Sequence, residues 1–267
     1  MNQKGGVGKT TTSVNLSSAL AASGKKVQLI DLDPQAHASL HLGLTFEKEF
    51  ASVYDALVGN ESLDAVRRKV NDNLWLVPAH LDLASADFEL ASVLGRELIL
   101  RDKIAADSME FDYLIVDCPP SLGVLTLNAL AAVDEVFIPL QPHFLALHGL
   151  SKLLQTIDLV SRRLNPKLHV SGVVLCMFER TTLSSDVKND VQAFFSQSDN
   201  RPKAWSRVRV FSTNIRRNIR LAEAPSFGKS IFQYDPKSNG AEDYLEFADE
   251  VLKMEEEANE EYEALSA

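Results

Sequence analysis

The sequence has few cysteines and no long hydrophobic run. Its 267 residues include only Cys118 and Cys176, which lie far apart, each in an apolar stretch. No CxxC pair is present, which argues against a disulfide or an iron–sulfur site within one chain, so we expect two buried thiols in a reducing compartment. No segment approaches the roughly 18 apolar residues that span a bilayer, and no apolar signal segment opens the chain. These absences predict a cytoplasmic protein.

Basic residues are also in the minority. Lys and Arg number 27 against 37 Asp and Glu, giving a net charge of −10, which taken alone argues against a nucleic-acid partner. The charge is uneven, however. The C-terminal stretch EEEANEEYEALSA has six acidic and no basic residues, whereas residues 201–229 hold eight Lys and Arg against Glu223 alone. The acidic end masks a basic segment, so partners must be inferred locally.

Short apolar runs alternate with helical patterns along the chain. The expected strands cover 26–33, 74–79, 113–119, 135–142 and 170–178. The expected helices cover 9–23, 81–106 with a break near Ser92, 122–132, 145–164, 183–197 and 240–264. Nearly continuous apolar strands indicate a parallel sheet covered on both faces. We expect a doubly wound α/β fold with a mostly parallel sheet and helices on both faces, forming one domain over 1–267 with an acidic C-terminal helix.

The strongest local signal is a phosphate-binding loop at the start of the chain. Its residues are Lys4, Gly5, Gly6, Val7, Gly8, Lys9 and Thr10. Glycines let successive backbone N–H groups point at a phosphate, and the helix that follows adds its positive dipole end. Lys9 would contact the β- and γ-phosphates, and the Thr10 hydroxyl would ligate Mg²⁺. The alternative is a glycine-rich turn with a helix cap, which the GKT sequence disfavours.

The loop departs from the usual GxxxxGK[ST] pattern, because Gln3 takes the first glycine position and Lys4 follows it. Three further segments accompany this variant: IDLDPQ (30–35), YLIVDCPPSLG (113–123) and RRNIRLAEAPSFGKSI (216–231). Together they resemble the ParA/Soj/MinD family of deviant Walker A ATPases, and most closely chromosomal ParA (Soj). The resemblance covers nearly the whole chain. It implies a P-loop NTPase fold, ATP and Mg²⁺ as cofactors, and ATP hydrolysis.

The resemblance assigns roles to two aspartates. Asp33 would orient the attacking water, supported by Asp31, because phosphoryl transfer needs a positioned water and neutralised charge. A helix N-cap before Pro34 is the alternative for Asp33. Asp117 ends an apolar strand, where a buried carboxylate needs a strong partner. Mg²⁺, surrounded by Thr10, Asp33 and Asp117, would be that partner; a cap for the following Pro-Pro turn is the weaker reading.

Other nucleotide contacts follow from the same resemblance. Lys4 would contact the nucleotide of the opposing subunit in an ATP-dependent homodimer, and Thr11 would contact the α-phosphate. Met177 and Pro225 would line the adenine site. Both also have ordinary readings as core or turn residues, so the adenine contacts are the least specific part of the interpretation.

The basic segment suggests contact with DNA. Its five candidate residues are Arg207, Arg209, Arg216, Arg217 and Arg220, around a possible strand–loop–helix unit. Family members that bind DNA use basic residues near this region to contact phosphates without reading bases, which makes binding salt-dependent. For any single arginine, ion pairing to an acidic helix is an equal alternative.

His37 and His41 have the spacing of two metal ligands on one helix face. No third ligand is apparent nearby, and zinc sites usually need at least three, so we expect packing or surface histidines. Family members usually have small or amide residues in this stretch.

Two functions remain in view. The first is a slow, partner-stimulated partitioning ATPase that dimerises on ATP, binds DNA non-specifically and is released by hydrolysis. It would serve chromosome or plasmid segregation with a ParB-like protein and associate with the nucleoid. The alternative is a MinD-like ATPase that positions membrane or cargo without DNA. MinD-type proteins end in a basic membrane helix, whereas this chain ends in glutamates, which an anionic bilayer repels. A more distant possibility is electron transfer of the nitrogenase-reductase type. It would need paired cysteines that bind a cluster at the dimer interface, and the positions of Cys118 and Cys176 disfavour it.

Family members carry a strand before the phosphate loop, but only Met1, Asn2 and Gln3 precede it here. In the family that strand lies in the centre of the sheet, beside the strand that ends at the Asp117 position. Its neighbours would otherwise keep unpaired backbone groups, each costing roughly 1–3 kcal/mol if buried. We therefore expect a short strand ahead of Met1 in the natural protein; a gap that the sheet tolerates, or that a dimer fills, is the alternative.

Overall fold

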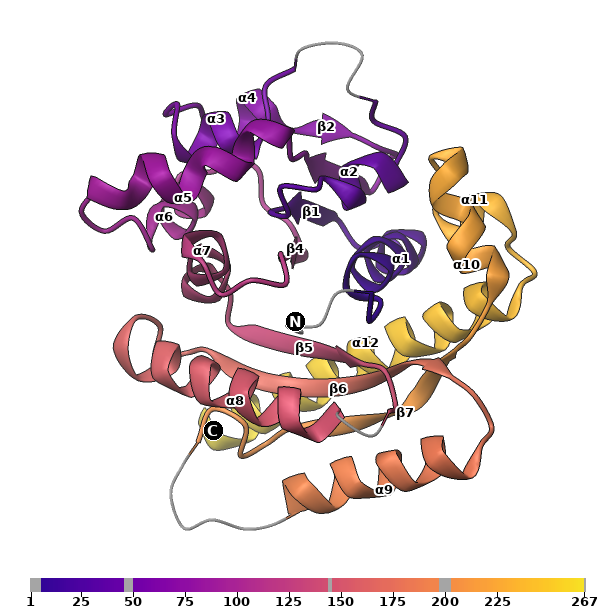
Figure 1. Ribbon diagram of the computed structural model, residues 1–267. Helices are drawn as coiled ribbons and strands as arrows, with labels where there is room; N and C mark the ends of the chain where they lie inside the picture. The colour runs from indigo at the N-terminus through magenta and orange to yellow at the C-terminus, as the bar shows by residue number, and fades with distance from the viewer. Residues whose placement is uncertain (1–5, 46–49, 144–145, 197–202, 267) are drawn as a thin grey trace.

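Strands and helices alternate along most of the chain (Figure 1). The structure, a computed structural model, describes residues 6–45, 50–143, 146–196 and 203–266. The strands are β1 (Val27–Asp31), β2 (Arg68–Lys69), β3 (Leu74–Val77), β4 (Tyr113–Asp117), β5 (Glu135–Leu140), β6 (His169–Phe178) and β7 (Arg209–Arg216). The longer helices are α1 (Lys9–Ala22), α6 (Ile99–Ala105), α7 (Val124–Ala132), α8 (Ala146–Arg163), α9 (Thr182–Ser196) and α12 (Asn239–Ser266).

Short helical turns make up the connections. They are α2 (His37–His41), α3 (Val53–Leu57), α4 (Leu63–Val66), η1 (Leu81–Ser85), α5 (Ala86–Glu89), η2 (Leu90–Ser92), α10 (Ile219–Glu223), η3 (Ala224–Phe227) and α11 (Ile231–Tyr234). The single helix expected over 81–106 is thus divided into four pieces. The break near Ser92 is present, and the chain between η2 and α6 contains Gly95 with φ +71°, a conformation that interrupts a helix.

The strands form two hydrogen-bonded sheets. In the first, ordered β2-β3-β1-β4, β1 pairs in parallel with both β3 and β4, and only the two-residue β2 is antiparallel. In the second, β5, β6 and β7 are all parallel. The prediction of a mostly parallel α/β fold is therefore confirmed, although the sheet is in two parts.

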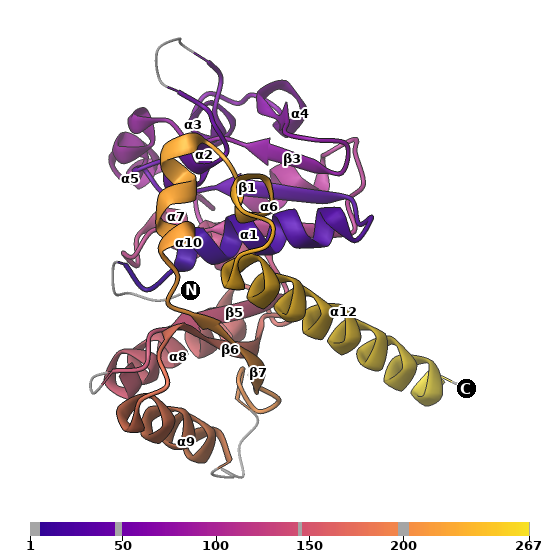
Figure 2. The same cartoon turned by 90° about the vertical axis from the view of Figure 1, so that its right-hand side faces the viewer.

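Helices cover both faces of these sheets. On β1, Val27 and Leu29 pack with α1 and Ile30 packs with the α3–α7 side, as strand alternation requires. On β6, Val173 packs toward α8 and α9, whereas Val174 packs toward α1 and α12. Figure 2 shows the second sheet beneath the first, with α12 extending away from both. This arrangement confirms the doubly wound class.

A cavity of about 380 Å³ lies where the two sheets meet. Residues 112–118 at β4 and residues of β5 line opposite sides of it, with apolar side chains of α1, α7 and α12 completing the lining. β4 and β5 are not hydrogen-bonded to each other, so each ends its own sheet. This gap is where the expected strand ahead of the phosphate loop would fit; within the described residues, no strand precedes α1.

Candidate functional site

A cleft of about 1000 Å³ opens at the carboxyl ends of the central strands. Segments distant in sequence meet in it: the phosphate loop, the chain after β1, the turn after β4, the end of β6 and the η3 region. Its lining includes Gly6, Gly8, Lys9, Thr10, Thr11, Asp33, Gln35, His37, Pro120, Met177, Pro225 and Phe227. Open parallel sheets usually bind ligands at this edge.

The described part of the phosphate loop is shaped by two glycines. Gly6 has φ +75° and Gly8 has φ +92°, a region that only glycine enters without strain. Gly8 is the residue before α1, so the loop delivers the N-terminus of that helix to the cleft. Val7, between them, is buried and anchors the loop to the core. Lys4 and Gly5 lie outside the described residues.

Two carboxylates meet at adjacent strand ends. Asp31 and Asp117 occupy paired positions of β1 and β4, and both are buried. Asp31 accepts the backbone N–H of Asp33 at 3.1 Å, and the Ser39 N–H and hydroxyl at 2.8 Å each. Burial, followed by repulsion from Asp117, raises the pKa of Asp31 to about 7, although these hydrogen bonds oppose the shift.

Asp117 is the better-placed ligand for a cation. Its Oδ1 accepts the Ser13 hydroxyl at 3.1 Å, but its buried Oδ2 has no hydrogen-bond partner. Burial raises the pKa of Asp117 despite hydrogen bonds from Thr10 and Ser13. Burial likewise lowers the pKa of the Lys9 ammonium, which the negative charges of Asp117 and Asp33 partly offset. Among the described residues of this site, the half-buried Lys9 is the cation beside these aspartates, and their net negative charge favours a further cation.

The residues present fit Mg²⁺. A hard divalent cation takes oxygen ligands, and Mg²⁺ keeps several waters while using one or two protein groups plus phosphate oxygens. The unpartnered Asp117 oxygen and the Thr10 hydroxyl are ligands of this kind. Among the described residues, no group of three or more His, Cys, Asp or Glu could hold a metal by protein ligands alone. The donor set suits a nucleotide-bound magnesium ion rather than a structural metal.

Asp33 lies at the cleft and stabilises the turn that follows it. Its side chain lines the cleft, and its Oδ1 accepts the Gln35 N–H at 2.9 Å, so it also caps the turn that leads to α2. Ala36, the residue before α2, has φ +51°, which is a strained backbone conformation for any residue other than glycine. The cap fixes Asp33 at the cleft, whereas its catalytic role stays a prediction.

Met177 and Pro225 lie in the same cleft as the phosphate loop. Met177 has φ +53° near the end of β6, where the pairing with β7 is irregular, and its side chain is partly exposed. Pro225 belongs to η3, which the C-terminal signature forms. The aromatic ring of Phe227, which we did not single out from the sequence, also lines this part of the cleft and stacks on Tyr234 at 4.9 Å.

Polar residues inside α1 were missed by the sequence analysis. Besides Ser13, the buried Asn15 accepts the Ile231 N–H at 2.9 Å and donates to the Thr11 carbonyl at 2.8 Å. It thereby ties the phosphate-loop helix to the C-terminal signature. The available signal was a polar residue within an apolar stretch of α1, because a buried amide must be hydrogen-bonded.

The five candidate arginines fall into two groups. Arg207 and Arg209 lie at the start of β7, whereas Arg216, Arg217 and Arg220 lie at its other end, roughly 20 Å away for a strand of this length. Ion pairs join Arg209 to Glu257, Arg217 to Glu179, and Arg220 to Glu223.

Arg216 is held most firmly of the five. It pairs with Glu242 and with the buried Asp243, and these carboxylates raise its pKa. An arginine that neutralises a buried carboxylate has a structural role. The other four, Arg207, Arg209, Arg217 and Arg220, are exposed and remain candidates for contact with an external phosphate, although the last three also form ion pairs.

The histidines and cysteines have separate environments. His37 is exposed, whereas His41 is buried and burial lowers its pKa to about 4.

Cys118 and Cys176 are both free, and burial raises their pKa values, to about 12 and about 11. Such thiols are unreactive packing groups. Among the described residues, no helix is long and apolar enough to cross a membrane.

Comparisons with known proteins find relatives over most of the chain. The model of a family described as AAA domain matches residues 1–170. The sporulation initiation inhibitor protein Soj of Bacillus subtilis (strain 168) is 47% identical over 252 residues, which are 94% of this chain and 95% of Soj. The chromosome partitioning protein ParA of Myxococcus xanthus is 43% identical, over 95% of this chain and 87% of that protein.

Solved structures give the same fold. Cobyrinic acid a,c-diamide synthase from Mycobacterium smegmatis, solved with an ATP analogue and magnesium, is 37% identical with a TM-score of 0.78, covering 95% of this chain and 92% of that chain. The cell division ATPase MinD of Pyrococcus furiosus has a TM-score of 0.74 over 95% of this chain and 97% of its own. At 24% identity, the second likeness concerns the fold alone.

Proposed function

This chain belongs to the Soj and ParA family of chromosome-partitioning proteins, and from that membership we propose that it is a Mg²⁺-dependent ATPase that drives DNA segregation. The observation that carries the proposal is the content of one cleft. Lys9, Thr10 and Asp33 line it together, and the unpartnered oxygen of Asp117 lies behind Thr10 and Lys9. A glycine-rich turn used only as a helix cap would not need this set of charges.

The phosphate loop binds the nucleotide. Backbone N–H groups at Gly6, Gly8 and the first turn of α1 point at the phosphates, and the helix dipole adds favourable charge. The Lys9 ammonium contacts the β- and γ-phosphates. Their negative charge raises the pKa of Lys9 and so opposes the effect of burial. Met177 and Pro225 contact the adenine from the other side of the cleft.

Hydrolysis requires positioning more than a strong base. Thr10 and Asp117 would hold Mg²⁺, which would supply positive charge that neutralises the phosphates. Asp33 orients the attacking water, and the hydrogen bond from Asp33 N–H to Asp31 fixes the backbone that presents it. With no strong base in place, we propose a slow basal rate that a ParB-like partner stimulates.

The nucleotide state would control assembly and DNA binding. Lys4 reaches the nucleotide of a second copy, so ATP joins two protomers and hydrolysis separates them. The dimer binds DNA non-specifically through the exposed arginines around the end of β7, and the protein associates with the nucleoid in the cytoplasm. The relatives of this chain include Soj and the chromosome partitioning protein ParA, which supports this role over the membrane-positioning alternative.

Two substitutions test the proposed chemistry separately. Lys9→Ala removes the cation from the phosphates and should weaken ATP binding by a factor of about 100, since charged hydrogen bonds contribute ~1.5–3 kcal/mol. Asp33→Ala should keep ATP affinity within about threefold while lowering the hydrolysis rate at least about 100-fold. Asp102→Ala, at an exposed carboxylate on α6, is the control. Full hydrolysis by Asp33→Ala would overturn its assignment, and unchanged ATP binding by Lys9→Ala would overturn the nucleotide site.

A further inference from the structure

His41, at the end of α2, is a buried histidine in the wall of the cleft. The residue is 2% exposed, and its Nε2 has no hydrogen-bond partner among the described residues. A hydrogen bond joins the ring to the Lys229 backbone, and because Nε2 is unpartnered, the other ring nitrogen, Nδ1, makes it. Buried polar atoms without a partner are uncommon, so Nε2 calls for a group from outside the chain.

The contact with Lys229 decides what Nε2 can bind. This hydrogen bond raises the pKa of the ring, so the ring donates it and the Lys229 carbonyl accepts. Burial has the larger effect and lowers the pKa of His41 to about 4, so the ring is neutral at pH 7. A neutral imidazole has one donor and one acceptor nitrogen. Because Nδ1 is the donor, Nε2 is the acceptor, and its missing partner is a hydrogen-bond donor.

His41 lies toward the end of the cleft that the proposed function assigns to the base. The chain just after α2 touches the chain just after η3, because a Cβ on Gly43 would lie 3.1 Å from the Gly228 carbonyl oxygen. η3 carries Pro225 and Phe227, which line the cleft together with His41. The aromatic ring of Phe227 is exposed, and such a ring is suited to stacking on a base.

The phosphate end of the cleft has an unpartnered atom of its own, Asp117 Oδ2, which suits a cation. The Nε2 of His41 does not suit the ligands of that end. Ionised phosphate oxygens accept hydrogen bonds and donate none, and Mg²⁺ prefers oxygen ligands. Zinc would need three or more protein ligands, and the described part of the chain offers no such group. An uncharged N–H or O–H donor remains.

We propose that His41 recognises the nucleoside half of ATP, with Nε2 accepting a hydrogen bond from the adenine amino group or from a ribose hydroxyl. The inference rests on the proposed ATP site and adds a polar contact to it, since the side chains of Met177 and Pro225 carry no strong hydrogen-bonding group. A site that hydrogen-bonds its substrate rejects an analogue without the donor, because a buried group is then left unpaired. His41 therefore contributes to specificity as well as to affinity.

The experiment measures the affinity of the full chain for ATP and three analogues, each with Mg²⁺, by isothermal titration calorimetry. Purine riboside triphosphate lacks the amino group, whereas 2′-deoxy-ATP and 3′-deoxy-ATP each lack one hydroxyl. In the wild type, the analogue without the donor should bind about tenfold more weakly than ATP. His41→Leu, which has no acceptor, should lower the affinity for ATP by the same factor and leave that for this analogue unchanged. His41→Gln, whose amide oxygen accepts hydrogen bonds, should bind ATP more tightly than His41→Leu.

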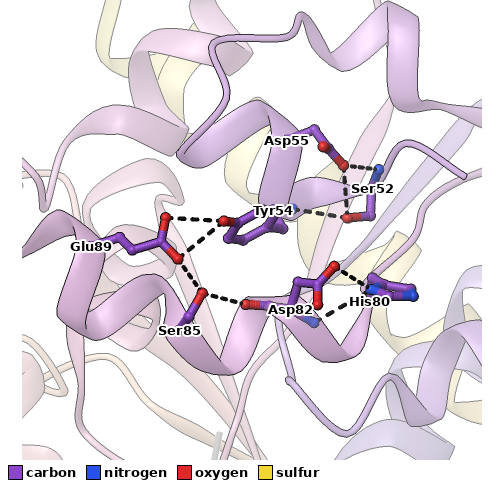
Figure 3. Close-up of polar contacts among 7 residues, drawn as sticks. All are labelled: Ser52, Tyr54, Asp55, His80, Asp82, Ser85 and Glu89. Carbon is purple, nitrogen blue, oxygen red and sulfur yellow. Dashed lines mark hydrogen bonds and ion pairs between the residues drawn. The ribbon is translucent and has the colours of Figure 1, made fainter. Parts of the chain in front are cut away.

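His80 provides the matched control (Figure 3). Its ring is also engaged in a polar contact, with Nδ1 2.9 Å from the Asp82 carboxylate, but it caps η1 and does not line the cleft. His80→Leu therefore removes an imidazole and its contact away from the nucleotide, and it should leave all four affinities unchanged. Melting temperatures show whether each variant is folded.

The outcomes separate the inference from the proposed function. If the wild type binds no nucleotide, the proposed ATP site fails and the inference fails with it. If the wild type binds ATP and all three analogues equally, the site stands and the inference alone is overturned, without recourse to any variant. Unchanged ATP affinity in His41→Leu would mean that water alone meets Nε2. An equal loss for ATP and every analogue would give His41 a purely structural role. Either result also overturns the inference.

Discussion

Asp31 is a residue whose charge depends on its neighbours. It lies buried at the end of β1, across from Asp117, and its pKa is raised to about 7. In an unfolded chain its pKa would be about 3.9. The folded state therefore holds a proton that the unfolded state has lost between these values. Its contribution to stability is fully present below about pH 4 and is lost as the pH rises toward 7.

We predict that Asp31→Asn makes the ligand-free protein less sensitive to pH. Asparagine cannot ionise, so the part of the stability loss that Asp31 causes between about pH 4 and 7 should disappear. Losing one acceptor for Ser39 or Asp33 should lower stability by about 1 kcal/mol below about pH 4, where Asp31 is protonated in both the folded and the unfolded state. Urea unfolding at several pH values measures both effects. Parallel pH profiles for the variant and the wild type would contradict the assignment of the raised pKa to Asp31.

Individual site residues differed in how far the sequence could reveal them. The phosphate loop and the two aspartates were named in advance because each stands at a strand end or helix start, and the structure gathers Lys9, Thr10 and Asp33 in one cleft with Asp117 beside it. Asn15 and Phe227 were not named. The partner of Asn15, Ile231, lies over 200 residues away, and that of Phe227, Tyr234, lies across a turn. Contacts made by folding distant segments together leave no local pattern.

At the scale of elements, the long periodic segments were predicted and the short ones were not. β1, β3, β4 and β5 fall within expected strands and β6 begins one residue before its own, because their apolar runs are nearly continuous. Helices α2, α3 and α4 have four or five residues each, too short for a helical period to be visible. Helix α2 depends on Asp31, whose carboxylate accepts a hydrogen bond from the Ser39 N–H. The spacing of residues in the sequence cannot reveal a contact between two separate elements.

A gap between β4 and β5 divides the strands into two sheets. Within the part of the chain that the structure describes, no strand pairs with either edge, and the cavity of about 380 Å³ between them has a mainly apolar lining. The four residues that precede Asp117 in β4 are only partly buried, unlike the fully buried β1. An extended segment entering this gap and leading into the phosphate loop would pair with both edges.

We predict that an added strand-forming segment stabilises the protein. Five or six apolar, β-branched residues placed before Met1 should raise the free energy of unfolding by about 2 kcal/mol or more, because new hydrogen bonds add about 1 kcal/mol each. Amides of β4 and β5 should exchange more slowly with deuterium. An extension of equal length with proline at alternate positions cannot pair and serves as the control. Equal stability of the two extended chains would show that the gap does not accept a strand.

At the scale of the whole molecule, the net charge conceals its distribution. The overall value is −10, yet the exposed Arg217 and Arg220 lie beyond the end of β7, before and within α10, and η3, which lines the cleft, follows α10 in the chain. Acidic residues of α12 pair with Arg209 and Arg216, whereas Arg217 and Arg220 pair with carboxylates outside this acidic helix, so α12 repels an external phosphate less at those two. We therefore expect DNA contact near the nucleotide rather than along the whole basic segment.

Binding to non-specific DNA across a salt series, with and without ATP, tests the central claim most directly. The wild type, Asp33→Ala and Arg217→Ala/Arg220→Ala are compared by fluorescence anisotropy. We predict binding that requires ATP, falls steeply with salt, persists longer in Asp33→Ala, and weakens with a shallower salt slope when both arginines are removed. ATP binding without any DNA binding, at low salt as at high, would contradict the account of this chain as a DNA-partitioning ATPase.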